Sequence, residues 1–355
     1  MPILTRSAQS SDIPALRRIW TEAFGIGDDE DFFSFYFDPE LCVTADHDGV
    51  PAAAGYLIPF GNLICCGTVV PCAMIYAAAV LPELRSHGFG TYIVRDLIKT
   101  GQSSGYPAII LCPSEDSLFD YYSTRSALRD WFYVSEQRMN TVELQANSVT
   151  NKPDAPPSLS RVSADEYIML RESLLQNIPH ITVNADAMKY QEILCKSSGG
   201  GLFKISSPAG ESCAIVEAQP DGSVSIKELL SHEGSESALL ASIVSAFPAP
   251  EYMIRMPAPI EKQPSVSINA VKQHNTETPY KGTISASIHA AIQHNTEAPY
   301  KGIISSPEIS TQHGTRGVVR RFGMLAESSG ILFPLKPEIS YELPAIAPWY
   351  GPAFD

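Results

Sequence analysis

The stretch that decides the fold is residues 77–91, with the sequence AAAVLPELRSHGFGT. Its first residues are small and apolar, and they predict the end of a buried strand. Pro82 has no amide N–H and therefore ends the hydrogen-bond ladder of that strand. The pattern R-x-x-G-x-G, made by Arg85, Gly88 and Gly90, follows directly and opens an amphipathic helix.

A glycine-rich turn at the start of a helix is a site for anions. Helix N-termini leave backbone N–H groups unsatisfied and carry partial positive charge. Because glycine has no Cβ, a diphosphate can approach the amides of residues 86–91 closely. Two other phosphate motifs are excluded. A Rossmann fingerprint requires G-x-G-x-x-G after the first strand, a P-loop requires G-K-[S/T], and neither occurs.

Residues 1–146 predict one mixed α/β domain in the order β-α-α-β-β-β-α-β-α-β. The aromatic-rich segment 32–37 is consistent with core packing or with a short helix over a binding cleft. The expected elements are a helix from 10–14 to Gly25, a hairpin of 41–46 and 52–59 with its turn at 48–49, strands near 63–70 and 73–80, a helix from 88 to 103, a strand at 108–112, a helix at 117–123, and a final pair of strands within 131–144.

In this position, between an apolar strand and a long helix, the R-x-x-G-x-G pattern resembles motif A of the GNAT N-acetyltransferases. Residues 109–114 (IILCPS) and 118–122 (LFDYY) resemble the fifth strand and the next helix of that family. The resemblance is closest to the two-part Eis-like acetyltransferases, which share the Val-x-Pro-x-x-Arg spacing and an extended C-terminal half. It covers the first 145 residues well and the remainder loosely.

The resemblance implies a GNAT fold, with a central mixed but mostly antiparallel sheet flanked by helices. It also implies an acetyl-CoA-dependent N-acetyltransferase, in which a primary amine attacks the thioester directly in a ternary complex. Backbone groups of 78–80 are expected to pair with the pantetheine arm and 86–91 to hold the pyrophosphate, while Arg85 either contacts phosphate or fixes the loop. The expected acetyl-CoA-binding residues are Ala78, Ala79, Val80, Arg85, Ser86, His87, Gly88, Phe89, Gly90, Thr91, Pro113 and Ser114.

Two catalytic roles also follow from the resemblance. Tyr122 matches the tyrosine that protonates the departing CoA thiolate, and Tyr121 is its rival because adjacent residues point about 100° apart on a helix. Relatives commonly have glycine after this tyrosine, whereas residues 123–128 (STRSAL) lack it. The C-terminal carboxylate of Asp355 is the expected base, since the segment before it is apolar and aromatic.

The rest of the chain predicts a linker at 147–160 and a second, degenerate GNAT-like half at 161–355. We call residues 86–91 the anion cradle. The equivalent residues of the second half, 230–236 (LSHEGSE), contain acids that repel a diphosphate, so one CoA site per chain is expected. The second half is expected to complete the acceptor cleft or to form a homo-oligomer interface. Its expected elements are helices within 161–195, strands at 201–205, 213–217 and 224–230, a helix at 237–247 and a strand at 252–256.

Residues 266–285 recur at 286–305 and are identical at 14 of 20 positions. Two copies are too few for a solenoid. The segment is either a duplicated strand and loop or a dedicated binding surface. Its histidines lack the spacing of metal ligands, so no metal is expected.

Composition limits the remaining choices. An apolar fraction of 44% and a charged fraction of 18% are typical of soluble globular proteins, and no apolar run is long enough to cross a membrane. The irregularly spaced cysteines and the absence of a secretory signal predict reduced thiols and a cytoplasmic protein. The net charge of −14 argues against nucleic acid and favours a cationic small-molecule amine as acceptor. The alternative functions are a non-catalytic acyl-CoA-binding module and an oligomeric scaffold.

Overall fold

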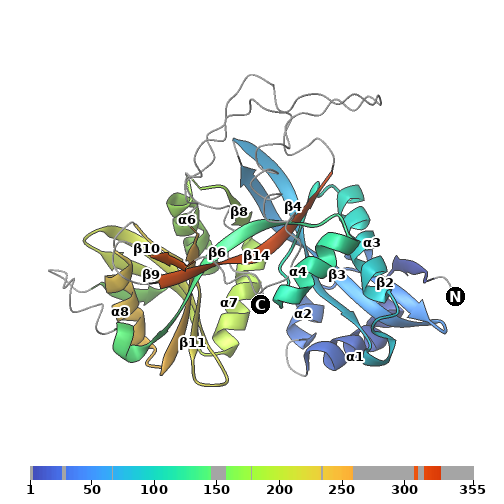
Figure 1. Cartoon of the computed structure of the whole chain (residues 1–355), viewed down its shortest axis with the longest axis horizontal. Helices are drawn as coiled ribbons and strands as arrows, with labels where there is room; N and C mark the ends of the chain where they lie inside the picture. The colour runs from blue at the N-terminus through green and yellow to red at the C-terminus, as the bar shows by residue number, and fades with distance from the viewer. Residues whose placement is uncertain are drawn as a thin grey trace.

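Figure 1 shows the computed structural model, in which two halves meet along a shared sheet. The structure describes residues 3–25, 29–65, 67–144, 157–176, 178–232, 235–258, 308–310 and 316–328. Asp355 and the duplicated segment 266–305 lie outside these residues, so the predictions made for them stay predictions.

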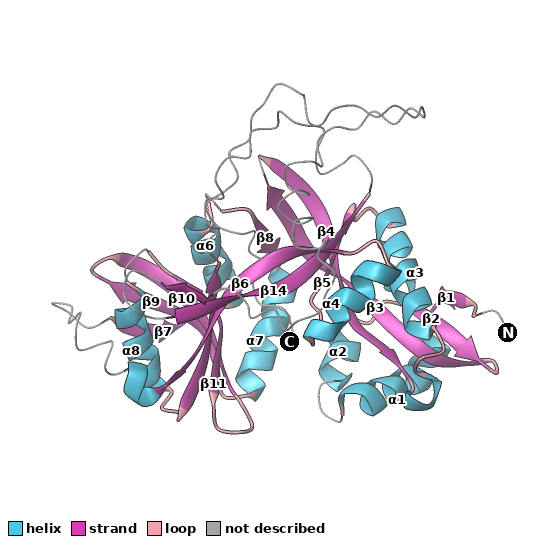
Figure 2. Cartoon of the chain, in the orientation of Figure 1, coloured by secondary structure: helices cyan, strands magenta, loops and turns pink. Residues whose placement is uncertain are grey.

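The first half has the predicted order of elements (Figure 2). Helices α1 and α2 cover one face of its sheet, and α3 and α4 cover the other. The bounds are β1 (Thr5–Ser7), α1 (Ile13–Phe24), α2 (Asp29–Phe35), β2 (Cys42–His47), β3 (Val50–Cys65), β4 (Thr68–Val80), α3 (Phe89–Ser103), β5 (Ala108–Leu111), α4 (Asp116–Arg125) and β6 (Arg129–Asn140).

The hairpin region differs from the sequence prediction in one respect. The strands expected at 52–59 and 63–70 are not separate, because β3 runs unbroken to Cys65 and β4 begins at Thr68. Pro59 is tolerated inside β3 because it falls between the stretch paired with β2, which ends at Tyr56, and the stretch paired with β8, which begins at Gly61. A residue without an N–H is accepted where one strand edge has no neighbour.

The end of the first half also differs. Only one strand, β6, forms where a pair was expected, and residues 141–144 are helical. A capping box explains the helical turn: the Asn140 amide donates to Glu143, and the Glu143 amide donates to the Asn140 side chain, each at 2.9 Å. The second strand of the expected pair is therefore supplied from elsewhere.

The second half contains the predicted β-β-β-α-β core, together with two strands that were not predicted. Residues 158–160, predicted as linker, belong to β7, and a strand, β8, interrupts the region expected to be helical. The bounds are β7 (Ser158–Arg161), α6 (Ala164–Leu174), β8 (His180–Val183), α7 (Ala185–Ser197), β9 (Gly201–Ser207), β10 (Gly210–Ala218), β11 (Val224–Leu230), α8 (Glu236–Ala246), β12 (Glu251–Pro257), β13 (Glu308–Ser310) and β14 (Arg316–Glu327).

The two halves exchange their last strands. β14, from the C-terminal part of the chain, lies between β5 and β6 and is antiparallel to both. In return β6, from the first half, pairs with β12 of the second half. Figure 1 shows β6 and β14 running side by side between the halves. The sheet is therefore continuous across the predicted domain boundary.

Helix contacts strengthen this junction. Phe32 of α2 is fully buried and stacks on Trp20 of α1, with ring centroids 4.8 Å apart. Phe35 and Tyr36 instead contact the ring of Tyr190 in α7, at 5.9 and 5.1 Å. The aromatic segment thus belongs to the core at its start and joins the halves at its end. Among the described residues, no helix is long and apolar enough to cross a membrane.

Candidate active site

The site begins where β4 and β5 separate. These parallel strands pair from Cys72–Ala108 to Ile75–Leu111 and no further. Beyond that point β4 continues to Val80 with only β3 on its other side. Within the described residues, the edge of β4 at 78–80 therefore has no strand partner. An extended ligand can pair with such an edge through backbone hydrogen bonds.

A bulge in β4 marks the separation. Ala77 has a φ of 47°, in the left-handed region, and the register between β3 and β4 shifts opposite it, at Gly55. A Cβ on Gly55 would lie 2.7 Å from the Leu97 side chain and 3.3 Å from the Ala78 backbone. Glycine is therefore required here, because α3 and the bulge both approach the backbone of β3.

The loop from β4 to α3 turns sharply through two left-handed residues. Ser86 has a φ of 66°, and Gly88, the N-cap of α3, has a φ of 95°. The Arg85 side chain donates from Nε to the Val80 carbonyl at 3.3 Å, and the His87 Nδ1 lies 2.9 Å from the Arg85 carbonyl. This contact is consistent with the predicted role of Arg85 in fixing the loop, and because the guanidinium is exposed, the alternative of a phosphate contact stays a prediction.

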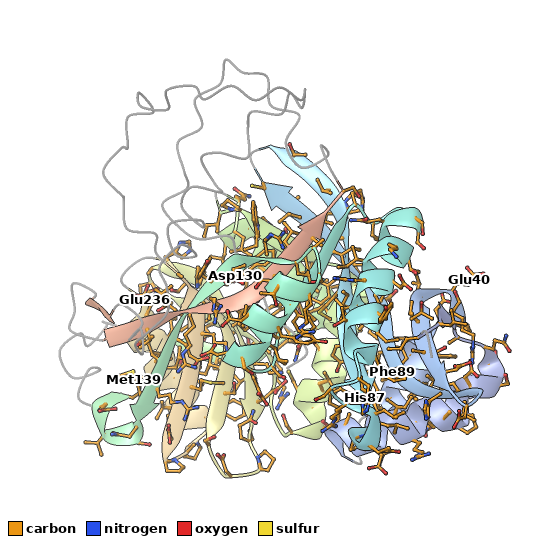
Figure 3. All side chains as sticks on the ribbon, turned by 45° about the vertical axis from the view of Figure 1, so that its right-hand side comes forward. Glu40, His87, Phe89, Asp130, Met139 and Glu236 are labelled. Carbon is orange, nitrogen blue, oxygen red and sulfur yellow. The ribbon has the colours of Figure 1, made fainter. Side chains whose placement is uncertain are left out.

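The residues predicted to form the anion cradle lie in the loop before α3 and in its first turn. Figure 3 labels His87 and Phe89 at this end of the helix. The first amides of a helix have no intrahelical acceptor and point outward along the axis. The amide of Thr91 does have one, since it donates to the Gly88 carbonyl at 3.1 Å. Within the predicted range of 86–91, the amides at 86–90 are therefore the ones that remain available to an anion.

Gly90 is also constrained by its neighbours. A Cβ at this position would lie 3.2 Å from the Tyr121 hydroxyl and 3.7 Å from the Val80 side chain. The contact with the hydroxyl is tighter than an ordinary packing distance. Gly90 therefore lets α4 approach the first turn of α3, which a larger residue would prevent.

The two candidate tyrosines occupy different environments. The Tyr121 hydroxyl lies 3.0 Å from Thr91 Oγ1, so it joins α4 to α3. The Tyr122 ring packs in the same apolar cluster as Ala78 and Val80. Its hydroxyl makes no hydrogen bond to any residue that the structure describes. Burial, with a smaller contribution from Tyr121, raises the pKa of Tyr122 to about 12.

Sequence reasoning missed the residue that anchors α4. Arg321 of β14 contacts Asp120 at 3.0 Å and Asp130 at 3.5 Å, and it donates to the Asp116 carbonyl at 3.3 Å. Its guanidinium also lies 4.7 Å from the centre of the Phe119 ring. No local sequence signal links positions 120 and 321, because the contact depends on the insertion of β14.

The remaining predicted residues lie at the end of β5. Pro113 is buried and Ser114 is exposed just before α4. Cys112 is half-buried, and its thiol donates to the Phe322 carbonyl of β14 at 3.1 Å. The described candidates thus lie on the elements that border the separation of β4 from β5, which we call the opening: β4, β5, α3 and α4. No group of side chains suited to a metal ion is found among the described residues.

This geometry agrees with a family match. Residues 5–125 match the family model of the acetyltransferase (GNAT) domain. Residues 5–125 form a GNAT acetyltransferase domain. The match covers the elements from β1 to α4 and so includes the whole opening described above. No curated protein sequence matches the chain.

Solved GNAT structures share the fold over most of the chain. A GCN5-related N-acetyltransferase from Kribbella flavida is 15% identical with a TM-score of 0.56, covering 91% of this chain and 70% of its own. One from Anabaena variabilis is 12% identical with a TM-score of 0.57, covering 91% and 72%. Eis1 from Mycobacterium abscessus is 12% identical with a TM-score of 0.52, covering 71% and 65%. At these identities the likeness establishes the fold.

Proposed function

We propose that this GNAT protein transfers an acetyl group from acetyl-CoA to a primary amine. The observation that carries the proposal is the unpaired edge of β4 at 78–80 leading directly into the glycine-rich start of α3. The edge suits the amide-bearing pantetheine arm, and the cradle at 86–90 suits a diphosphate. Gly88 fits a ligand that approaches the backbone closely, because a Cβ there would meet only Ile3 of the described residues within 4 Å, at 3.7 Å, and the φ of 95° favours glycine.

Tyr122 is the proposed general acid. The neutral amine forms a bond to the thioester carbonyl carbon, the carbon–sulfur bond breaks, and the Tyr122 hydroxyl gives its proton to the leaving thiolate. A second proton leaves the nitrogen for solvent or a base. A pKa of about 12 keeps Tyr122 protonated at neutral pH, as an acid must be. Tyr121 is assigned a different role, because its hydroxyl is engaged with Thr91 beside the cradle.

The proposed acceptor is a cationic small molecule. The support is the net charge of −14, which favours the approach of cations over long range. The acceptor is proposed to reach the thioester from the side of the sheet where α2 of the first half meets α7 of the second. The described cysteines are free thiols, mostly buried, which supports a cytoplasmic location.

A matched pair of glycine variants tests the cradle. Gly88→Glu places a carboxylate at the proposed diphosphate site and a side chain at a φ of 95°. Gly105→Glu makes the same change at a φ of 91°, in open space beyond the other end of α3. In isothermal titration we expect the affinity for acetyl-CoA to fall at least about a hundredfold in Gly88→Glu and to stay unchanged in Gly105→Glu.

Two results would overturn the proposal. One is undiminished acetyl-CoA binding by Gly88→Glu. The other is the failure of the native protein to release CoA from acetyl-CoA with any member of a panel of polyamines, aminoglycosides, amino acids and peptide amines. Binding without turnover would instead favour the acyl-CoA-binding module.

A further inference from the structure

Arginines near the cradle differ from those elsewhere in the protein. Eight arginines form ion pairs with carboxylates, namely Arg6, Arg17, Arg18, Arg138, Arg171, Arg255, Arg320 and Arg321. Five others, among the side chains that the structure describes, have no carboxylate partner: Arg85, Arg95, Arg125, Arg129 and Arg161. Four of these five lie in or beside α3 and α4. Described arginines without a carboxylate partner are thus concentrated at one place in an acidic protein.

Contacts with the backbone and with one ring hold two of these guanidinium groups in place. Arg95 donates from Nε to the Arg125 carbonyl at 2.6 Å, which leaves its two terminal nitrogens for other acceptors. The Arg125 guanidinium lies 5.2 Å from the centre of the Tyr121 ring. Both side chains are exposed. A guanidinium fixed in this way loses little conformational entropy when it binds an anion.

Their position relative to the cradle is defined by α3 and Tyr121. Arg95 follows Thr91 by four residues, so the two lie on one face of α3 with Cβ atoms about 6 Å apart. Tyr121 contacts Thr91 with its hydroxyl and Arg125 with its ring. Arg95 and Arg125 therefore lie about one helical turn beyond the cradle, where the Arg95 side chain of α3 reaches the Arg125 carbonyl of α4.

Arg129 is unsuited to the same task. Its Nη1 donates to the Leu128 carbonyl at 2.8 Å and lies 3.4 Å from the carbonyls of Ser123 and Ser126. It therefore closes the C-terminal end of α4. Arg85 lies in the cradle loop itself, where its Nε donates to the Val80 carbonyl, so its terminal nitrogens stand beside the proposed diphosphate and not one turn beyond it. This leaves Arg95 and Arg125 as the pair that can converge on one phosphate outside the cradle.

We propose that Arg95 and Arg125 bind the 3′-phosphate of CoA and make the enzyme select CoA over its 3′-dephospho form. The inference rests on the proposed function, because it assumes that the cradle holds the diphosphate of the same molecule. The 3′-phosphate is a dianion near neutral pH on the ribose beside that diphosphate, and guanidinium groups bind phosphate through paired N–H donors. Among the described residues near the cradle, no other two arginines lack both a carboxylate partner and a role in the cradle loop or at the end of α4.

The test compares CoA with 3′-dephospho-CoA by isothermal titration. We expect the native protein to bind CoA at least about tenfold more tightly than 3′-dephospho-CoA. Arg95→Met and Arg125→Met should each reduce that ratio to about threefold or less and leave the affinity for 3′-dephospho-CoA unchanged. Arg138→Met is the matched control, since it removes an exposed arginine of β6 that pairs with Glu251 of β12 and not with α3 or α4, and it should preserve the ratio.

The outcomes separate the two proposals. Equal affinities in the native protein, or a ratio unaffected by both variants, would overturn the role of this pair even if acetyl transfer is observed. Binding of neither nucleotide would contradict the proposed function together with this inference. A fall in the affinity for both nucleotides by the same factor would show that the arginines act through the cradle or the fold and not on the 3′-phosphate.

Discussion

The two halves share one topology but use the space beside their fourth strand differently. In the first half β4 leaves β5 after Ile75, and in the second β11 leaves β12 after Ile226. The residues of β4 beyond the separation are mostly half-buried and carry small side chains. The equivalent residues of β11, 227–230, are all buried. The two strands separate in both halves, and in the second half all the residues of β11 beyond the separation are buried.

Two of these buried residues of β11 carry charged side chains. Glu228 is fully buried, as is Arg171 of α6, and the two form a hydrogen-bonded ion pair at 3.0 Å. Lys227 pairs with Glu217 at 3.1 Å and is also buried. The helix that follows begins with Glu236, a residue that stabilises the helix N-terminus but repels an incoming anion. Under the proposed function, the first half uses its backbone edge and helix start to bind a ligand, whereas the equivalent positions of the second half hold buried ion pairs.

The largest effect is expected from Tyr122→Phe in the first half. Removal of the general acid should lower kcat by about 10²–10⁴-fold, with little change in the affinity for acetyl-CoA. Stability should not fall, because the hydroxyl has no hydrogen-bond partner among the described residues. Steady-state kinetics and thermal unfolding measure both quantities.

The pH profile sharpens this prediction. Tyr122 is active in its protonated form, which persists until the pH approaches its pKa of about 12. Activity should therefore rise as the acceptor amine loses its proton and should show no falling limb from Tyr122 below about pH 11. A falling limb centred near pH 9 that is retained in Tyr122→Phe would contradict this assignment.

A substitution at the buried ion pair of Arg171 and Glu228 in the second half should lower the stability of the protein and leave its turnover unchanged. Arg171→Met leaves Glu228 buried without its cation, which typically costs about 3–5 kcal/mol of unfolding free energy. Urea unfolding should detect the loss, while the folded protein keeps its affinity for acetyl-CoA. The double variant Arg171→Met with Glu228→Gln should recover part of the loss, because it removes the uncompensated charge. An unchanged unfolding midpoint in Arg171→Met would contradict the role of the pair in stability.

This contrast between the halves was only partly visible in the sequence. The order of elements up to α4 and the start of α3 at Gly88 followed from local patterns, because proline, glycine and apolar spacing act over a few residues. The acids after β11 predict that the second half lacks a cradle, and this stays a prediction. The pairing of Glu228 with Arg171 could not be predicted, since it depends on how α6 packs on the sheet.

The errors share one physical origin. β8 was missed within a region expected to be helical, although the helices around it carry ordinary cap signals: Ser163 accepts from the Glu166 amide, and Asn184 accepts from the Ala187 amide. β8 has only four residues and lies in the short connection between α6 and α7, so its sequence is a weak strand signal. It is stabilised by pairing with β3, which is far away in the chain. The place of β14 between β5 and β6 is likewise a non-local pairing that no local pattern encodes.

The smallest effect on activity is expected where the halves meet, at Arg321. Burial raises the pKa of the Asp130 carboxyl, and the guanidinium of Arg321 opposes that rise. Arg321→Met removes this charge together with the contacts to Asp120 and the Asp116 carbonyl, so α4 is held less firmly. A small displacement of a catalytic group lowers the rate more than it lowers binding. We therefore expect kcat to fall about tenfold while KM for acetyl-CoA stays within about twofold.

Two further variants distinguish a role of Arg321 in positioning α4 from an effect on the fold as a whole. Arg320→Met removes the neighbouring arginine, which contacts Glu136 and not α4, so it should leave kcat nearly unchanged. Arg321→Lys should recover only part of the activity, because one ammonium cannot reach both aspartates and the carbonyl as the planar guanidinium does. Hydrogen exchange should show faster exchange of α4 amides than of α3 amides in Arg321→Met. If kcat instead falls equally in both arginine variants, β14 acts on the sheet as a whole, and the two halves are coupled through the strands and not through α4.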